Sequence, residues 1–419
     1  MMKKCFVVFS ALALILLLCG NFALAEDKVL KVGVLGPFTG PCADAGQQFK
    51  ASTLMAMEKI GYKIGDYKLE LVWIDDQSDP AKAATAYAEA VERQGIQIGL
   101  GGWNSSVSVS VMDVSAQYKI PHFLAFGSTE IVNQKYKADP QKYSYWGGKG
   151  WPVPGDLMQG YVESLNKAIE KGIFKPEKKL VAIYGEDTDW GRGTGAAFKK
   201  EFAKIGWEIL SEDYFPITQT DFYPLLSKYK KAGVAAIAGT SSSLPVMSAL
   251  IKQAQEVGLK AAIIADGLGW AGDWYKMTGS SSNGVLDMIP QLVSPQAKEW
   301  AKAWEAKAKI KASPSTGGLS YDYANYFIKI LKRALEKYGK IDKETAYKIL
   351  VEEMVTGKIT YSAAEGAIIM KEYRFTKETW PDLVIAPDAY FFPVIQYKDG
   401  KGDIVYPADI AERALEVRK

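Results

Sequence analysis

The chain has 419 residues, of which 48% are hydrophobic and 24% are charged. This length and composition predict a globular protein large enough for two domains, each with a core of its own. The formal net charge of only +3 argues against the strongly basic surface typical of proteins that bind nucleic acid or anionic membranes.

The N-terminus has the pattern of a cleavable signal peptide. Lys3 and Lys4 precede an apolar run over residues 6–18, and the stretch Ala23-Leu24-Ala25 offers small residues at the two positions that signal peptidase reads. We therefore expect residues 1–25 to be removed and the mature chain to be periplasmic or otherwise extracytoplasmic. No later segment has eighteen uninterrupted apolar residues, so the mature chain has no predicted membrane span.

The cysteines bear on anchoring and on redox chemistry. Cys19 raises the possibility of a lipoprotein, but Leu18 stands before it where a lipoprotein signal has a small residue, and we favour cleavage after Ala25. That cleavage removes Cys5 and Cys19 and leaves Cys42 as the sole thiol, which excludes an intrachain disulfide. It also leaves 49 basic and 48 acidic residues, a nearly neutral balance.

Strands alternate with helices through the first part of the mature chain. The expected strands cover residues 28–35, 69–74, 96–100 and 121–126, and each is followed by a turn and by apolar residues at helical spacing. Strands that are apolar almost throughout and alternate with helices indicate a parallel sheet covered on both faces.

The same pattern restarts after a glycine- and proline-rich linker over residues 146–155. Further strands are expected over 180–184, 207–214, 234–238 and 261–265. Residues 295–354 are mainly helical in pattern, and the tail from Ile368 is strand-like again. We predict an α/β protein with two Rossmann-like lobes, each with a parallel central sheet, joined by a multi-strand hinge. The first lobe would comprise 26–149 plus about 291–380, and the second 150–290 plus about 381–419.

One strand end stands out as a candidate anion site. The stretch IGLGGWNSS over residues 98–106 is a short apolar run that ends in paired glycines and leads into a helical pattern. Free backbone N–H groups and hydroxyls at a helix N-terminus favour a carboxylate. Because ligands of open α/β sheets lie beyond the carboxyl ends of the strands, two facing lobes would form one cleft there.

Five motifs in order resemble a known family. They are KVGVLGPFTGPCADAG, DDQSDP, GLGGWNSS, FGSTE and YGEDTDWGRGTGAAF, and the resemblance runs from about Lys31 to Tyr397. The chain resembles the periplasmic solute-binding proteins of branched-chain amino acid ABC importers, which have a type I periplasmic-binding-protein fold.

The resemblance implies a ligand site with two halves. The carboxylate of the ligand would be held at two strand-end turns by Ser105, Ser106, Ser128 and Thr129. From the second lobe, Asp266 would receive an ammonium group, Trp190 would close over the ligand, and Thr240 with Ser241 would line the next strand end. Helix capping without a ligand is the alternative for the hydroxyl residues and for Asp266.

The first loop departs from the family pattern. Ala45 stands where relatives can carry an aromatic residue, and together with Trp103 it suggests a reshaped cleft. Tryptophans gather near predicted strand ends and the crossover, at positions 103, 146, 151, 190, 270 and 274. Some of them would be core residues, and the others could stack on a bulky apolar ligand or on a cation.

The sequence offers no metal or nucleotide site. The run Asp75-Asp76-Gln77-Ser78-Asp79 fails as a calcium loop because Pro80 and Ala86 stand where glycine and glutamate are needed, so it is read as a turn and helix cap. The run of alternating glycines over 191–195 lacks the full nucleotide-binding spacing. We expect neither a metal nor a cofactor.

The sequence also has none of the common motifs of catalytic sites. The single histidine, His122, falls inside a predicted strand, and the chain has no GxSxG elbow and no phosphate-binding P-loop. We expect no catalytic residue, although catalysis by carboxylates alone stays open at this level.

These observations predict the substrate-binding subunit of an ABC importer, monomeric, that delivers its solute to a membrane permease. The expected ligand is a hydrophobic or branched-chain amino acid, and the alternative is an aromatic or other small organic carboxylate. A second alternative is a ligand-sensing protein that serves a signalling partner.

Overall fold

The computed structural model describes residues 28–417. The signal peptide predicted over 1–25, with Cys5 and Cys19, lies outside the described residues. Within them, no helix combines the length and the apolar character needed to cross a membrane.

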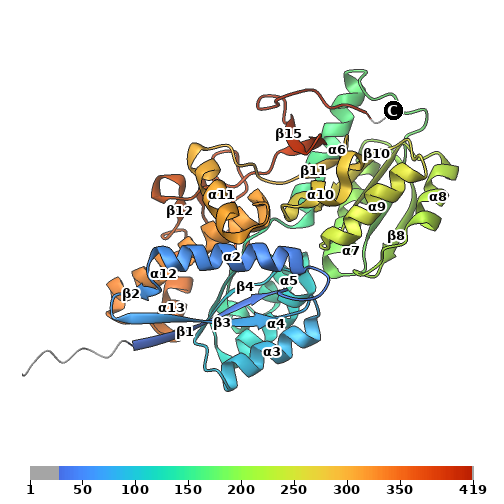
Figure 1. Ribbon diagram of the computed structural model, residues 1–419. Coiled ribbons are helices and arrows are strands. Elements are labelled where there is room, and N and C mark those ends of the chain that lie inside the picture. The colour runs from blue at the N-terminus through green and yellow to red at the C-terminus, as the bar shows by residue number, and fades with distance from the viewer. Residues whose placement is uncertain (1–27, 418–419) are drawn as a thin grey trace, which may run out of the picture.

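Two lobes lie side by side, each built on a central sheet (Figure 1). The first sheet has six strands in the order β2-β3-β1-β4-β5-β6, all parallel except the edge strand β2. Their bounds are β1 Lys28–Gly36, β2 Lys63–Ile64, β3 Tyr67–Asp75, β4 Ile98–Gly101, β5 His122–Ala125 and β6 Trp146–Lys149.

Helices from two distant parts of the chain cover this sheet. The earlier ones are α2 (Ala43–Lys59), α3 (Pro80–Glu92), α4 (Ser105–Tyr118), α5 (Glu130–Ala138) and the short η1 (Lys142–Tyr145). The later ones are α11 (Pro295–Ala308), η4 (Pro314–Leu319), α12 (Ser320–Tyr338), α13 (Lys343–Ile349) and η5 (Leu350–Met354). Helices α11 and α12 and the segment η4 pack on α2. Helix α3 begins as its sequence predicts, because the Asp79 side chain accepts hydrogen bonds from the N–H groups of Ala81 and Lys82 and Pro80 occupies the first helical position.

The second sheet has seven strands in the order β15-β14-β11-β10-β9-β7-β8. The five parallel strands are β7 Leu180–Glu186, β8 Glu208–Phe215, β9 Ala236–Thr240, β10 Ala262–Asp266 and β11 Leu286–Met288. The antiparallel strands β14 (Val394–Lys398) and β15 (Lys401–Tyr406) come from the C-terminal part of the chain and complete the sheet.

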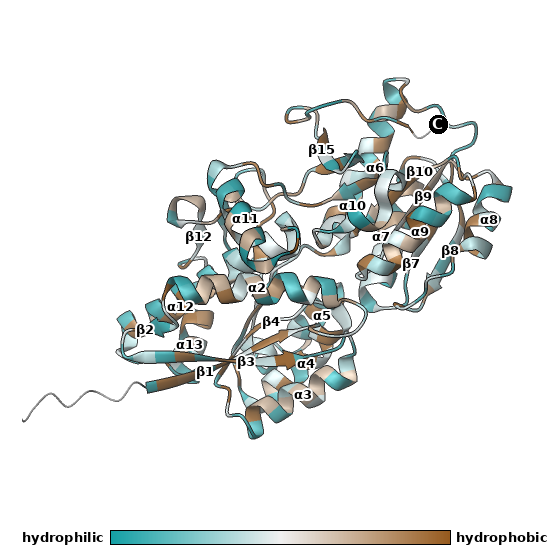
Figure 2. Ribbon diagram, viewed as in Figure 1, coloured by the Kyte–Doolittle hydropathy of each residue, from teal (hydrophilic) through white to brown (hydrophobic). Residues whose placement is uncertain are grey.

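Helices and short turns surround the second sheet. They are α6 Pro154–Glu170, α7 Asp189–Lys204, α8 Tyr223–Ala232, α9 Leu244–Glu256, η2 Leu268–Trp270, α10 Trp274–Thr278 and η3 Gly279–Ser282. A small hairpin follows η5 in the sequence and precedes β14. It consists of β12 (Tyr361–Ser362) and β13 (Glu372–Tyr373), with η6 (Ala363–Glu365) in the connection between them. Figure 2 shows hydrophobic residues along the strands of both sheets and mixed hydropathy along the helices that cover them.

The predicted α/β fold class is confirmed. The chain passes between the two sheets three times, over residues 150–153, 289–294 and 374–393, which makes the hinge multi-stranded. One local prediction is wrong: the segment 146–155, read as a linker, contains strand β6. Two glycines follow Trp146 and weaken the strand pattern, but the Trp146 ring stacks on His122 at 4.7 Å between centroids and is buried.

Candidate ligand-binding site

The turn between β4 and α4 owes its shape to the paired glycines. Gly101 and Gly102 have φ angles of 89° and 106°, and a Cβ at Gly101 would lie 2.2 Å from the Phe49 ring. The tight turn brings Trp103 to the space between the lobes and places Ser105 at the first residue of α4.

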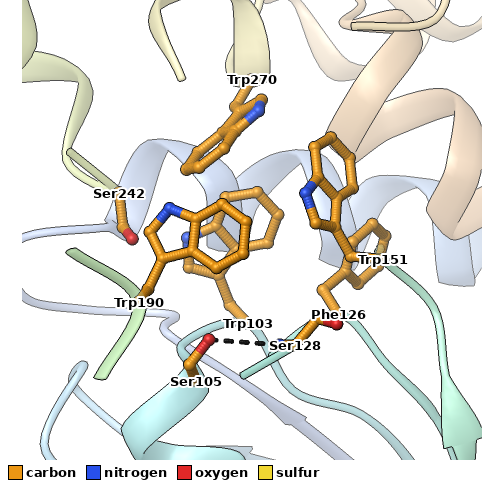
Figure 3. A pocket seen from close by; sticks show the side chains of 8 residues that line it. All are labelled: Trp103, Ser105, Phe126, Ser128, Trp151, Trp190, Ser242 and Trp270. Atoms are coloured by element: carbon orange, nitrogen blue, oxygen red, sulfur yellow. Dashed lines mark hydrogen bonds between the residues drawn. The ribbon is translucent and has the colours of Figure 1, made fainter. Parts of the chain in front are cut away.

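A second turn, after β5, meets the first one. The backbone N–H of Ser128 donates to the Ser105 hydroxyl oxygen at 3.1 Å, so the two strand ends are joined (Figure 3). The Ser128 hydroxyl is buried and has no hydrogen-bond partner. A buried hydroxyl without a partner is unfavourable unless something else supplies one.

A small cavity lies between the lobes at these strand ends. Four tryptophans, one phenylalanine and three serines line it, namely Trp103, Phe126, Trp151, Trp190, Trp270, Ser105, Ser128 and Ser242 (Figure 3). Both lobes contribute, since Trp103 follows β4 whereas Trp190 is the second residue of α7 and Trp270 ends η2. None of the lining residues carries a charged side chain.

The aromatic rings contact one another across this space. The Trp270 ring lies 5.4 Å from Trp103, 5.6 Å from Trp151 and 5.9 Å from Trp190 between centroids. The cavity that remains has a volume of about 20 Å³, little more than one water molecule needs. A larger solute therefore enters only when the lobes stand further apart.

Indole nitrogens supply further unsatisfied donors. The N–H groups of Trp103, Trp151 and Trp270 have no partner, whereas that of Trp190 donates to Thr240 Oγ1 at 2.9 Å. The lining thus combines apolar surface with hydrogen-bond donors that a ligand could use, the composition expected of a small-molecule site.

Thr240 and Asp266 support the cavity from behind and are not among the residues that line it. Thr240 Oγ1 lies 2.9 Å from the Asp266 carbonyl oxygen and 3.1 Å from its Oδ2, and the Tyr161 hydroxyl donates to Oδ1 at 2.9 Å. Burial, together with the nearby Asp287 carboxyl, raises the pKa of Asp266 well above its ordinary value. The side chain is thus a buried acceptor within the second lobe.

Three further hydroxyls predicted at strand ends have structural partners. The Ser106 oxygen accepts from the backbone N–H of Asp189 at 3.1 Å, which joins the first lobe to the second. The Thr129 oxygen caps α5 by accepting from Ile131 N. The Ser241 hydroxyl lies 3.4 Å from a Glu186 oxygen. None of the three lines the cavity.

The structure therefore brings together part of the predicted site. Trp103, Ser105, Ser128 and Trp190 line one cavity, and Ser106, Thr129, Thr240 and Asp266 lie outside its lining. The site residues predicted from the sequence did not include Phe126, Trp151, Trp270 and Ser242, which also line the cavity. A signal existed for two of these, because Trp151 and Trp270 belong to the tryptophans noted near strand ends and the crossover.

The turn that carries Trp270 is held from both lobes. Asp287 on β11 accepts from the N–H groups of Gly267 and Gly269 at 3.2 and 2.7 Å. The hydroxyl of Thr316, in the segment η4 that packs on α2, donates to the Trp270 carbonyl oxygen at 2.6 Å. These contacts fix the position of the indole at the cavity.

A comparison with known protein families shows to which family the chain belongs. The sequence profile of the periplasmic binding proteins matches residues 29–377. The chain belongs to the periplasmic binding protein family. The family resemblance inferred from the five motifs is thereby confirmed.

This binding protein has relatives over most of its length. It is 28% identical over 323 residues to the Leu/Ile/Val-binding protein homolog 6 of Brucella abortus (strain 2308), covering 75% of this chain and 76% of that one. It is 27% identical over 370 residues to the leucine-, isoleucine-, valine-, threonine- and alanine-binding protein of Pseudomonas aeruginosa, covering 86% and 92%.

A solved structure shows the same fold. It is a solute-binding protein of an ABC transporter from Rhodopseudomonas palustris BisB5, in complex with 3,4-dihydroxybenzoic acid, with a TM-score of 0.71 and 21% identity. The match covers 89% of this chain and 95% of that one. Among residues 28–417 no group of three or more His, Cys, Asp or Glu side chains is placed to hold a metal ion.

Proposed function

We propose that this binding protein is the solute-binding subunit of an ABC importer, exported by cleavage after Ala25. It binds a small carboxylate in the cavity between the lobes and, as a monomer, delivers it to a membrane permease. The observation that carries this proposal is the buried, unpartnered Ser128 hydroxyl beside the first residue of α4, on a cavity that both lobes line.

The carboxylate end of the ligand fits the first lobe. A helix N-terminus favours a carboxylate by about 0.3–1 kcal/mol when exposed and by up to about 2 kcal/mol when partly buried. The hydroxyls of Ser105 and Ser128 add hydrogen bonds, which are stronger to a charged acceptor. Ser106 acts in closure through Asp189, and Thr240 with Asp266 holds Trp190 in place.

Two ligand classes are candidates for this cavity. Hydrophobic and branched-chain amino acids are supported by the names of the relatives from Brucella and Pseudomonas. Aromatic and other small organic carboxylates are supported by the four tryptophans in the lining and by the dihydroxybenzoate bound to the structural neighbour. In both cases the solute leaves unchanged, because the lining holds no base or nucleophile beyond serine hydroxyls.

A thermal-shift panel tests the proposal. Leucine, isoleucine, valine, 4-hydroxybenzoate and benzoate would each be added to the mature protein, and mass spectrometry would show whether the added compound is consumed. We expect at least one carboxylate to raise the melting temperature without turnover. No shift with any carboxylate would contradict the ligand assignment, and turnover would indicate an enzyme. Co-purification with a kinase rather than a permease would favour the sensing alternative.

A further inference from the structure

The tryptophan rings that line the cavity stand at steep angles to one another. The Trp270 ring is inclined by 86° to Trp103, by 81° to Trp151 and by 58° to Trp190. Figure 3 shows the rings arranged around one space rather than stacked as two parallel walls. Parallel walls suit a flat aromatic ring, whereas walls at steep angles surround a rounded group.

The lining offers no carboxylate to a primary ammonium. An ammonium brings three N–H donors and a full charge, both of which are costly to bury without acceptors. The oxygens of Glu186, the acidic residue bonded to the lining Ser242, already accept from Ser242 N at 2.6 Å, Ser242 Oγ at 2.8 Å and Thr188 Oγ1 at 2.9 Å. The Asp266 oxygens are likewise bonded within the second lobe.

Tryptophan faces attract a cation without hydrogen bonds. The negative face of an indole is the strongest such surface among the side chains, and the attraction grows when the cation is removed from water. A quaternary ammonium has no N–H to satisfy and is rounded. It therefore matches both the angles of the rings and the lack of acceptors in the lining.

We propose that the ligand is an amino acid whose nitrogen is fully methylated, a quaternary ammonium carboxylate. This inference rests on the proposed function and concerns the same cavity. The methylated nitrogen is surrounded by an aromatic cage, which consists of Trp103, Trp151, Trp190 and Trp270. The carboxylate lies at the Ser128 hydroxyl. The rings contact one another at 5.4–5.9 Å in this conformation, so binding moves Trp190 and Trp270, which belong to the second lobe, away from Trp103.

A pair of isosteric compounds isolates the charge. Glycine betaine and 3,3-dimethylbutanoate have the same shape and the same carboxylate, but only the first carries a positive nitrogen. Calorimetric titration of the mature protein is expected to show glycine betaine binding about tenfold to thirtyfold more tightly. Equal affinity for the two compounds would overturn the proposal.

A matched pair of variants locates the effect. Trp103→Leu removes one face of the cage and is expected to lower affinity for glycine betaine by about tenfold, whereas Trp103→Phe, which keeps a ring, loses less. Trp207→Leu is the control, because Trp207 is also buried but lies outside the lining. Equal losses in Trp103→Leu and Trp207→Leu would count against the cage.

The same titrations separate this inference from the proposed function. Binding of leucine or 4-hydroxybenzoate without binding of glycine betaine would overturn the cage and leave the importer role standing. Failure of every carboxylate to bind would overturn both.

Discussion

Asp287 is predicted to control the shape of the site although it does not touch the cavity. It lies fully buried on β11, where its Oδ1 accepts from the adjacent Met288 N at 2.8 Å and from the Tyr161 hydroxyl at 3.3 Å. Its oxygens also accept from three donors elsewhere in the lobe, Gly267 N at 3.2 Å, Gly269 N at 2.7 Å and the Tyr397 hydroxyl at 2.7 Å. Replacement of Asp287 by alanine leaves these three donors buried without a partner. At about 1 kcal/mol for each donor, the low end of the usual cost, the free energy of unfolding should fall by about 3 kcal/mol.

Denaturant unfolding of the wild type and of Asp287→Ala measures this loss. Glu299→Ala is the control, because it removes the same charge from an exposed position on α11. Asp287→Asn keeps one acceptor oxygen and should lie between the two. Solute affinity should fall together with stability in Asp287→Ala, since the turn that it holds carries Trp270. If the free energy of unfolding of Asp287→Ala lies within about 0.5 kcal/mol of the control, the usual range for surface changes, the three donors do not depend on Asp287.

Three further substitutions, at Ser128, Ser106 and Asp76, test other parts of the structure. Ser128→Ala should weaken carboxylate binding by about tenfold to a hundredfold in calorimetry, whereas Ser248→Ala, which removes a buried unpartnered hydroxyl from α9, should leave it unchanged. Ser106→Ala removes the bond from Asp189 N across the cleft. It should raise the radius of gyration in solution scattering and weaken binding by about threefold to tenfold; an unchanged radius would exclude Ser106 from closure. Burial raises the pKa of Asp76 to about 7, so the folded state retains a proton that the unfolded chain loses near pH 4, and stability should fall as pH rises from about 4 to about 7. Asp76→Asn should flatten that fall in denaturant unfolding, and an unchanged slope would count against the assignment.

The two-lobe architecture could be predicted because its signals are local. Buried parallel strands are apolar throughout, and turns with Gly, Pro, Asp and Ser separate them from amphipathic helices. Helix α3 illustrates this, since Asp79 and Pro80 mark its start in the sequence and act there in the structure. Strand β6 was missed because its signal is not local: two of its four residues are glycine, and it is held by pairing with β5.

The cavity was only partly predictable for a related reason. Ser105 and Ser128 are recognisable because each carries a hydroxyl in the turn region after a strand, at the start of a helix for Ser105 and two residues before one for Ser128. The choice among hydroxyls is made by tertiary contacts: Ser106, one residue further on, faces Asp189, and Thr129 caps its own helix. Nothing local distinguishes these neighbours from one another.

The tryptophans illustrate the same limit. Trp151 and Trp270 line the cavity, whereas Trp146 stacks on His122 and Trp274 packs on Tyr397. All four looked alike as aromatic residues near strand ends. Their roles are decided by how the second lobe meets the first, which the sequence pattern of either lobe alone does not encode.

A small carboxylate is proposed to bind between the lobes at the ends of β4 and β5. A crystal structure of the mature protein grown with the tightest-binding compound of the panel tests it most directly. We expect ligand density enclosed by Trp103 and Trp270, with a carboxylate oxygen within hydrogen-bond distance of Ser128 Oγ. Ligand density at any other place on the molecule, or a carboxylate turned away from Ser128, would contradict it.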